Sequence, residues 1–267
     1  MIDYDYKKVY IQMEEGDEML TNQRYEKIID YLNANTMASV SELVEITSSS
    51  APTIRRDLTY LEEKGMLERI HGGATVSQIE REEDYGEKSV RNLSKKIKIA
   101  QKAAGLIEDG DIIFIDAGTT TYEMVPFISQ HNLTIVTNGI TLIEQLVRNG
   151  HQVHVLGGRI KPVTKAVVGP EVIDKISRLS FDKCFIGANA ADVMHGLSTP
   201  EEDEAYIKSR AIRQSRNAYA LVDSTKFNRT AFIRFADIED ASIITDDVHH
   251  PFVEKIKSRT EIYGGEK

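Results

Sequence analysis

The stretch TIRRDLTYLEEKGMLERIHGGA, residues 53–74, joins an amphipathic helix to a short hairpin. Three of its apolar residues recur at the spacing of one helix face: Ile54, Leu58 and Leu61. At 100° per residue, Arg56 lies most squarely opposite that face, and Arg55 lies on its flank. A helix that buries one side and presents paired guanidinium groups on the other suits a phosphate backbone better than it suits an ordinary surface.

Two further helices precede this stretch. Apolar residues at positions 25, 28, 29 and 32 predict a helix over residues 21–33. Ser41 then precedes a second, short helix with the sequence ELVEI, and the polar run TSSS follows as a turn. Ser50 is a suitable N-cap for a third helix from about residue 51 to residue 64. Its C-terminal stop is Gly65, because glycine favours the position after a helix.

The hairpin after the third helix completes a recognisable plan. The sequence MLERIHGGA predicts a β-hairpin that ends in Gly72–Gly73. Three helices followed by a hairpin predict a winged helix-turn-helix domain over residues 19–76, with the third helix in the major groove of double-stranded operator DNA. We expect the DNA contacts to come from Ser50, Thr53, Arg55, Arg56, Thr59, Arg69 and His71.

Charge opposes this interpretation, whereas the arrangement of motifs favours it. The chain has a net charge of −9, and residues 21–75 hold two Lys and four Arg against eight acidic residues. Because non-specific DNA affinity depends on the number of phosphates neutralised, one copy alone should bind weakly, so we expect a homodimer or homotetramer. Charge alone favours a helical protein-interaction module. The capped helix, the paired arginines and the hairpin within about 35 residues together outweigh it.

The remainder of the chain has the pattern of an α/β domain. Residues 77–96 are highly charged and are interpreted as a linker. From residue 97 to residue 267, apolar strands such as DIIFID and DKCFIGA alternate with helical segments. This alternation predicts a Rossmann-like parallel sheet covered by helices on both faces.

Polar loops follow several of these strands. The sequence DAGTTT, residues 116–121, is a turn and helix start whose N–H groups and hydroxyls can bind an anion. Three more loops should converge on the same sheet edge, at residues 137–139, 157–159 and 223–226. We expect the effector contacts to be Asp116, Gly118, Thr119, Thr120, Thr121, Thr137, Asn138, Gly157, Gly158, Arg159, Asn189 and Lys226.

Composition excludes several classes of protein. The sequence has no run of about 18 apolar residues, so we expect no membrane span. The first residues lack the apolar core of a signal peptide, and a single cysteine, Cys184, suits a core strand in a cytoplasmic protein. No histidine has metal-ligand spacing, so neither a metal nor a cofactor is predicted. Residues 1–18 are interpreted as a tail or a mis-assigned start, because codons for MEEGDE would resemble a ribosome-binding site before Met19.

The motifs TIRRDLTYLEEKGMLERIHGGA, DAGTTTYEM, FIGANAAD, GLSTPEEDEA and LVDSTKF closely resemble the DeoR family of bacterial transcription regulators. The likeness runs from Leu20 to about Asp246. It implies a winged helix-turn-helix joined to a sensor domain related to ribose-phosphate isomerases and CoA transferases, and a repressor of a sugar operon controlled by a phosphorylated sugar. The chain departs from the family pattern at Ser49, where valine is usual, and at Ala190, where glycine is usual.

An isomerase-like enzyme with a DNA-binding appendage is the alternative. Aldose–ketose isomerisation needs a base and a group that stabilises the enediolate. The related isomerases carry paired acids in a DGADE-like loop, whereas the matching loop here is GANAAD, with Asn189 in place of the first acid and Asp192 alone. The sequence therefore favours a sensor over an enzyme. Glu204 and Lys208, four residues apart, are fully explained as a surface helix pair, while the family resemblance also allows them to lie near the ligand.

Overall fold

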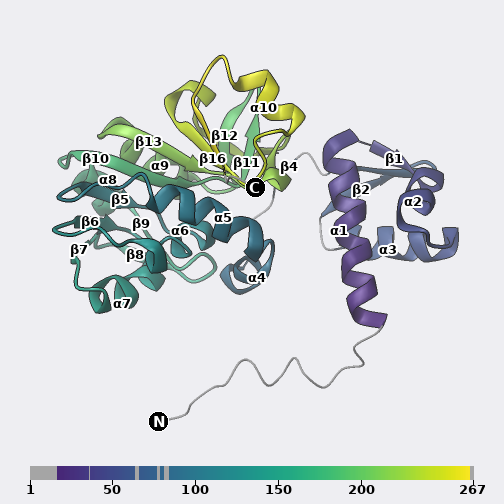
Figure 1. Ribbon diagram of the computed structural model, residues 1–267, viewed down its shortest axis with the longest axis horizontal. Helices are drawn as coiled ribbons and strands as arrows, with labels where there is room; N and C mark the ends of the chain where they lie inside the picture. The colour runs from purple at the N-terminus through teal and green to yellow at the C-terminus, as the bar shows by residue number, and fades with distance from the viewer. Residues whose placement is uncertain (1–16, 36, 64–65, 77–78, 81–83, 265–267) are drawn as a thin grey trace, which may run out of the picture. The chain divides into compact units, whose positions relative to one another are not determined.

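The computed structural model describes residues 17–35, 37–63, 66–76, 79–80 and 84–264 (Figure 1). The chain divides into two compact units, and the boundary between them falls between residues 77 and 78. Residues 1–16 lie outside the described part of the chain. They are most of the segment, residues 1–18, that was interpreted as a tail or a mis-assigned start. Within the described part, none of the helices combines the length and apolar character needed to cross a membrane.

The first unit is a winged helix-turn-helix. Its elements are α1 (Asp17–Asn35), β1 (Met37–Ser39), α2 (Val40–Thr47), α3 (Ala51–Glu63), β2 (Leu67–Ile70) and β3 (Gly73–Val76). The three strands form an antiparallel sheet in the order β1-β3-β2. The predicted apolar face of α3 is buried against Ile28 of α1 and Leu43 of α2.

Two details of this unit differ from the sequence-based expectation. Helix α2 begins one residue before Ser41, because Ser39 is its N-cap and forms a capping box with Glu42. The strand β1 was not expected at all. It has only three residues, of which Ala38 alone is buried, so its sequence carries no strand signal.

The wing depends on a glycine where β1 and β3 meet. A Cβ atom on Gly73 would lie 2.0 Å from the backbone oxygen of Ala38, which cannot move without breaking the sheet. We therefore expect Gly73→Ala to detach β1 from β3 and to lower the melting temperature of the first unit by several degrees. Thermal unfolding followed by circular dichroism would measure this. Gly157→Ala is the control, because nothing lies within 4 Å of a Cβ atom there, and an equal effect of both changes would contradict the argument.

The second unit is built on a parallel sheet of seven strands in the described part, in the order β17-β16-β13-β10-β5-β6-β7. In chain order these are β5 (Ile112–Ile115), β6 (Thr134–Thr137), β7 (Gln152–Val155), β10 (Phe181–Gly187), β13 (Ser215–Leu221), β16 (Ser242–Thr245) and β17 (Ile262–Gly264). Ile113 and Phe114 point to opposite faces, and both are fully buried. The central strand β5 is therefore apolar on both faces, as the sequence predicted for a sheet covered on both sides, whereas the edge strand β7 is mostly exposed.

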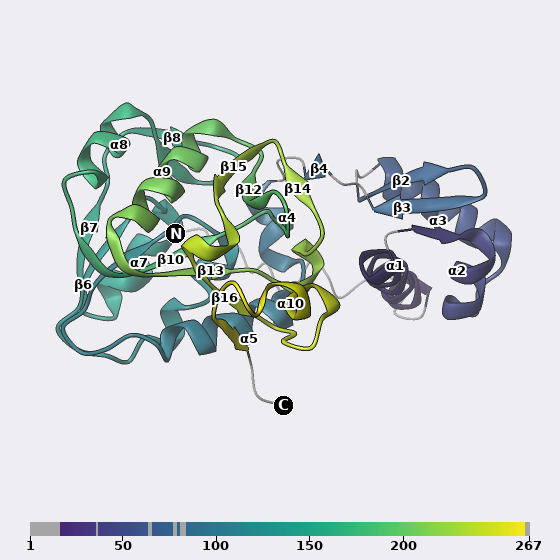
Figure 2. The ribbon, with the colours of Figure 1, turned by 90° about the horizontal axis from the view of Figure 1, so that it is seen from above.

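Helices cover both faces of this sheet (Figure 2). One face is covered by α5 (Leu93–Ala104), η1 (Val125–Phe127) and α7 (Ile140–Arg148). The other is covered by α8 (Pro170–Ile176), α9 (Glu202–Arg213) and α10 (Pro251–Ile256). The Rossmann-like α/β prediction is confirmed in these layers.

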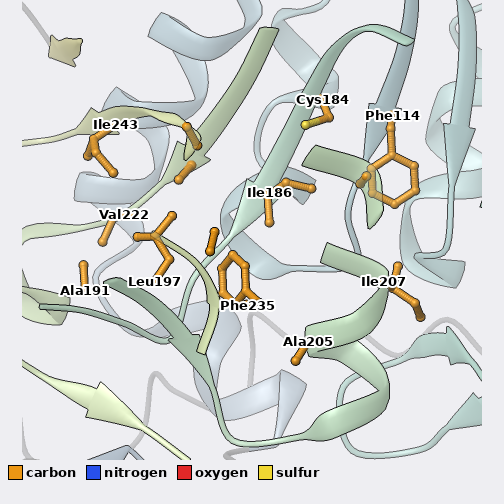
Figure 3. Packing of buried hydrophobic residues seen from close by; sticks show 14 of the residues in the cluster. Phe114, Cys184, Ile186, Ala191, Leu197, Ala205, Ile207, Val222, Phe235 and Ile243 are labelled. Atoms are coloured by element: carbon orange, nitrogen blue, oxygen red, sulfur yellow. The ribbon is translucent and has the colours of Figure 1, made fainter. Parts of the chain in front are cut away.

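Short elements surround the main sheet. They are β4 (Ile79–Glu80), α4 (Tyr85–Val90), α6 (Thr119–Tyr122), β8 (Arg159–Lys161), β9 (Ala166–Val168), β11 (Ala190–Asp192), β12 (Gly196–Thr199), η2 (Ser224–Lys226), β14 (Thr230–Ala231), β15 (Ile233–Ala236) and η3 (Ile238–Asp240). Strands β11, β12 and β15 form a small antiparallel sheet over the core that α9 also covers (Figure 3). The side chain of Cys184 lies in this core, where burial raises the pKa of its thiol to about 12.

The segment interpreted as a linker, residues 77–96, is partly helical. It contains α4 and the first residues of α5, and it belongs to the second unit from residue 78 onward. Its high charge looked like that of a solvated connection. In the structure, several of those charges line a cleft.

Candidate functional site

Helix α3 presents its two arginines to solvent. Ile54, Leu58 and Leu61 are buried, whereas Arg55 and Arg56 are exposed on the other side of the helix. At the start of the helix, the backbone N–H of Thr53 donates to Oγ of Ser50 at 3.3 Å, so Ser50 caps α3 as the sequence predicted. The hydroxyl oxygens of Ser50 and Thr53 are 2.8 Å apart, and Ser50 is exposed to solvent.

A buried ion pair sets the position of α3. Asp57 lies among the apolar residues of the helix and is only 3% exposed. Arg24 of α1 donates to it from two nitrogens, Nε at 2.5 Å and Nη2 at 3.1 Å. A bidentate pair fixes orientation as well as distance, so it holds the outward arginines at a defined angle to α1. No local pattern in the sequence indicates this pair, because its members are 33 residues apart.

The wing contacts the same helix. Arg69 of β2 donates from Nη1 to Oγ1 of Thr59 at 3.0 Å, and its backbone N–H donates to Glu62 at 3.0 Å. His71 is exposed in the turn between β2 and β3. All seven residues predicted to contact DNA thus lie on α3, at its start or on the wing.

In the second unit, the strand order identifies one crevice. The chain leaves β5 toward β6 on one side, and β10 returns on the other side of β5. In open parallel sheets, ligands bind at the carboxyl ends of the strands where the order reverses in this way. Asp116 directly follows β5, and its Oδ2 accepts a hydrogen bond at 3.1 Å from the backbone N–H of Gly187, the last residue of β10.

A cleft opens at this crevice. Its lining comes from the loops after β5, β10 and β13, from α9 and from the segment that contains α4, and consists of Tyr85, Lys88, Arg91, Asn92, Lys96, Ala117, Gly118, Thr119, Thr120, Thr164, Gly187, Ala188, Asn189, Glu204, Lys208, Leu221, Asp223 and Lys226. Five residues predicted from the sequence are among them: Gly118, Thr119, Thr120, Asn189 and Lys226.

Four predicted residues lie beneath the cleft and hold its loops. Asp116 forms a buried ion pair with Lys208. Thr121 donates to the backbone oxygens of Asp116 and Gly118, at 2.7 and 2.9 Å. Oδ1 of Asn138 accepts from the N–H of Ala117 at 2.9 Å, and Oγ1 of Thr137 accepts from the N–H of Gly139 at 2.9 Å. These bonds shape the turns after β5 and β6.

The predicted loop at Gly157, Gly158 and Arg159 is not part of the cleft lining. It follows β7, the edge strand, which lies three strands from β10, the central one of the three strands whose loops line the cleft. At about 4.8 Å per strand, that distance is roughly 14 Å. Arg159 is exposed and pairs with Asp203 at 2.9 Å.

The anion site expected at the start of a helix after residue 118 also differs from the prediction, because the helix there is very short. Helix α6 contains only four residues, because the chain turns into η1 with Pro126 near its start. One helical turn has a small dipole, so the positive potential of the cleft comes mainly from side chains.

Of the basic side chains in the cleft, only Lys226 was among the predicted effector contacts. Lys88, Arg91 and Lys96 lie in the segment interpreted as a linker, and Lys208 was explained as a surface pair with Glu204, with proximity to the ligand allowed only by the family resemblance. The spacing of Glu204 and Lys208 was the available signal. Both face inward on α9, with exposures of 7% and 3%.

The cleft has an excess of positive charge. Of the described residues that line it, five are basic and only Glu204 and Asp223 are acidic, although the chain as a whole is acidic. Burial lowers the pKa of Lys96 to about 8, and the nearby charges of Lys226, Arg91 and Lys88 act in the same direction, opposed by Asp223. Such crowding of like charges is relieved when an anion binds.

The carboxylate of Glu204 is ionised within this cleft. Burial opposes its ionisation, but Lys208, a hydrogen bond from Thr164 and the charge of Lys161 outweigh burial and lower its pKa. Oγ1 of Thr164 donates to Glu204 at 2.6 Å. Opposite, Oγ1 of Thr199 donates to Oδ1 of Asn189 at 3.1 Å. Carboxylate and amide groups of this kind bind sugar hydroxyls.

Comparison with known proteins agrees with both units. Residues 24–80 match the DeoR-like helix-turn-helix domain, and residues 91–247 match the DeoR C terminal sensor domain. The chain is 42% identical over 246 residues to a Bacillus subtilis protein described as an uncharacterized HTH-type transcriptional regulator FruR, covering 91% of this chain and 98% of that one. It is 35% identical to the lactose phosphotransferase system repressor of Staphylococcus epidermidis, covering 90% of this chain and 97% of that one. Ribose 5-phosphate isomerase A of Methanocaldococcus jannaschii aligns with 51% of this chain and 55% of its own, at 15% identity and a TM-score of 0.38.

Proposed function

The chain belongs to the DeoR family of transcription regulators, and we propose that it represses a sugar-utilisation operon under the control of a phosphorylated sugar bound in the cleft. The observation that carries this proposal is the positive cleft at the crevice of the sheet in an otherwise acidic chain. A phosphoryl group supplies the missing negative charge, and a sugar supplies hydroxyls for Asn189 and Glu204.

Different residues of the cleft would bind the two parts of the ligand. Lys96, Lys226 and the hydroxyls of Thr119 and Thr120 all line the cleft, and we assign them to the phosphoryl group. Asn189 and Glu204 are the polar groups for the sugar. A ligand that lacks either part would leave buried polar or charged groups without compensation, which is how a site rejects near analogues.

For the first unit, we propose that α3 enters the major groove while the wing lies over the adjacent backbone. The acidic balance of residues 21–75 means that a single copy neutralises few phosphates. We therefore propose a homodimer or homotetramer that places two such units on paired half-sites. The effector would act by favouring one geometry of that assembly.

The enzyme alternative receives less support from the geometry. Asp192, the remaining acid of the GANAAD loop, is absent from the cleft lining and accepts hydrogen bonds from the backbone of Met194 and from His195. Glu204 is in the cleft, but its lowered pKa makes it a weak base. We propose that the pocket binds its ligand without converting it.

A thermal-shift screen of the purified chain against sugar phosphates tests this function. At a hundredfold its dissociation constant, a true effector adds about 2.7 kcal/mol of apparent stability. Fructose 1-phosphate, fructose 6-phosphate and the corresponding free sugars form the first panel. Stabilisation by free sugars alone would refute a phosphoryl site, and conversion of any sugar phosphate, followed by NMR, would favour the enzyme.

Lys96 makes ligand affinity depend on pH. Its pKa of about 8 should rise when a phosphoryl group binds beside it, so above pH 8 the complex holds more protons than the free protein. Affinity should consequently fall as pH rises, by about tenfold from pH 7 to pH 9. Calorimetric titrations at pH 7, 8 and 9 measure the slope. Lys96→Met should flatten the profile, and a wild-type profile already flat would contradict this role.

A further inference from the structure

One wall of the cleft comes from the segment that leads in from the first unit. Helix α4 begins eight residues after residue 77, where the first unit ends. Tyr85 and Lys88 of α4 line the cleft, as do Arg91 and Asn92 just after it. Ligand contacts on this segment would act directly on the connection between the units.

Helix α4 is attached to the second unit by hydrogen bonds near both of its ends. None of its six residues is fully buried, although the hydroxyl group of Tyr85 is. Its start is fixed by Asp84, whose side chain accepts from the N–H of Gly86 at 2.8 Å, and by a backbone hydrogen bond at 2.9 Å from Tyr85 to Val163. The backbone oxygen of Lys88 also accepts from Nζ of Lys96. Because no residue of α4 is fully buried, packing supplies only part of its stability, so further contacts from a ligand can strengthen its hold on the sheet.

The joint between α4 and α5 consists of two residues, Arg91 and Asn92, that are not helical. Arg91 is extended, with φ −70° and ψ 131°, and Asn92 is left-handed, with φ 55°. Nδ2 of Asn92 donates to Oγ1 of Thr225 at 3.1 Å, which ties the start of α5 to the loop after β13. Backbone rotation at these two residues can therefore change the position of α4 while α5 stays with the sheet.

Charge then determines where α4 is most stable. Lys88 and Arg91 reach the cleft from one side, and Lys96, Lys208 and Lys226 reach it from the sheet and its helices. In the empty cleft these groups repel one another. A phosphoryl group between them reverses the balance, because each guanidinium or ammonium group gains a charge-assisted hydrogen bond.

We propose that Lys88 and Arg91 are ligands of the bound sugar phosphate, so that the effector fastens the connecting segment onto the sensor sheet. This inference rests on the proposed function, since it requires an anionic effector in this cleft. The free energy that couples sugar phosphate binding to DNA binding then comes from one difference. It is the difference in the ligand's affinity between the state in which the connecting segment is held against the sheet and the state in which it is released. No separate relay through the sheet is needed.

The test compares the full-length chain with the double variant Lys88→Ala, Arg91→Ala. Calorimetric titration uses fructose 1-phosphate, fructose 6-phosphate and inorganic phosphate as probes. Hydrogen exchange follows the amides of residues 84–92 with and without each probe. Lys98→Ala is the matched control, because Lys98 is an exposed basic residue on α5 that does not line the cleft.

We expect the double variant to bind at least tenfold more weakly and to lose the ligand-induced protection of residues 84–92, whereas Lys98→Ala behaves as wild type. The buried thiol of Cys184 should stay unreactive in each variant, which verifies that the core is intact. A double variant that binds as tightly as wild type, or wild-type binding without protection of these amides, overturns the inference alone. Wild-type protein that binds no sugar phosphate overturns the proposed function and the inference together.

Discussion

Replacing Lys208 by alanine should destabilise the second unit more than any other single change in the cleft. The Lys208 ammonium group pairs with Asp116, and both side chains are almost fully buried, at 4% and 2% exposure. Burial raises the pKa of Asp116, and Lys208 is the main opposing influence. Removing one partner of a buried pair leaves an uncompensated charge and costs about 3–5 kcal/mol. For a unit of this size the melting temperature should fall by about 10 °C.

The single cysteine provides a local measurement of this effect. Native Cys184 is buried in the core beside the cleft, and its thiol pKa is about 12, so a thiol reagent at pH 8 reacts only when the core opens. Labelling should be much faster in Lys208→Ala than in wild type. Arg210→Ala is the control on the same helix, because Arg210 is exposed and should change stability by less than about 0.5 kcal/mol.

A double replacement separates stability from binding. Asp116→Asn with Lys208→Met removes both charges and keeps side chains of similar volume, and such replacements are often neutral or stabilising. We expect the thiol of the double variant to be protected as in wild type, but sugar phosphate binding to be weakened, because the double variant lacks the positive charge of Lys208 in the cleft. If Lys208→Ala were as stable as wild type, the pair would not be holding the ends of β5 and α9 together.

The fold of the second unit was predictable because its strands carry a strong local signal. The central strands β5 and β10 are apolar on both faces, as Ile113 and Phe114 of β5 illustrate, and that pattern is typical of a covered parallel sheet. The small sheet of β11, β12 and β15 was not predictable in this way. Its strands are short and contain Gly196 and Ser198, so packing over the core rather than local pattern determines them.

The candidate site was predictable only where a loop directly follows a central strand. Gly118 and Lys226 follow β5 and β13, which lie on either side of β10, and both line the cleft. Arg159 follows a strand by the same rule, yet β7 is at the edge of the sheet. Strand order is a property of the whole fold, and no local sequence records it. The missed residues Lys88 and Lys96 lie in a charged segment that looks solvated until its tertiary contacts are known.

In the first unit, replacing Arg56 by alanine should weaken operator binding by about 10- to 100-fold. Arg56 is exposed on the side of α3 opposite its buried face, and the pair of Arg24 and Asp57 fixes the angle of that helix. A guanidinium group that meets a guanine edge contributes about 1–3 kcal/mol, whereas one that meets a phosphate contributes a smaller, sequence-independent amount. The stacked rings of Tyr25 and Tyr60 also brace α3 against α1, so the helix should stay in place after the change.

Fluorescence anisotropy with a duplex selected by the wild-type chain from a random pool measures this loss at several salt concentrations. If Arg56 reads a base, Arg56→Ala should relax the sequence preference at one position, and Arg56→Lys should not restore it, because lysine lacks the bidentate fork. If Arg56 neutralises a phosphate, all duplexes should weaken alike and the salt slope should fall by about one. Lys27→Ala is the matched control, since Lys27 is an exposed basic residue on α1. Equal affinity of Arg56→Ala and wild type at fixed salt would mean that α3 does not present this face to DNA.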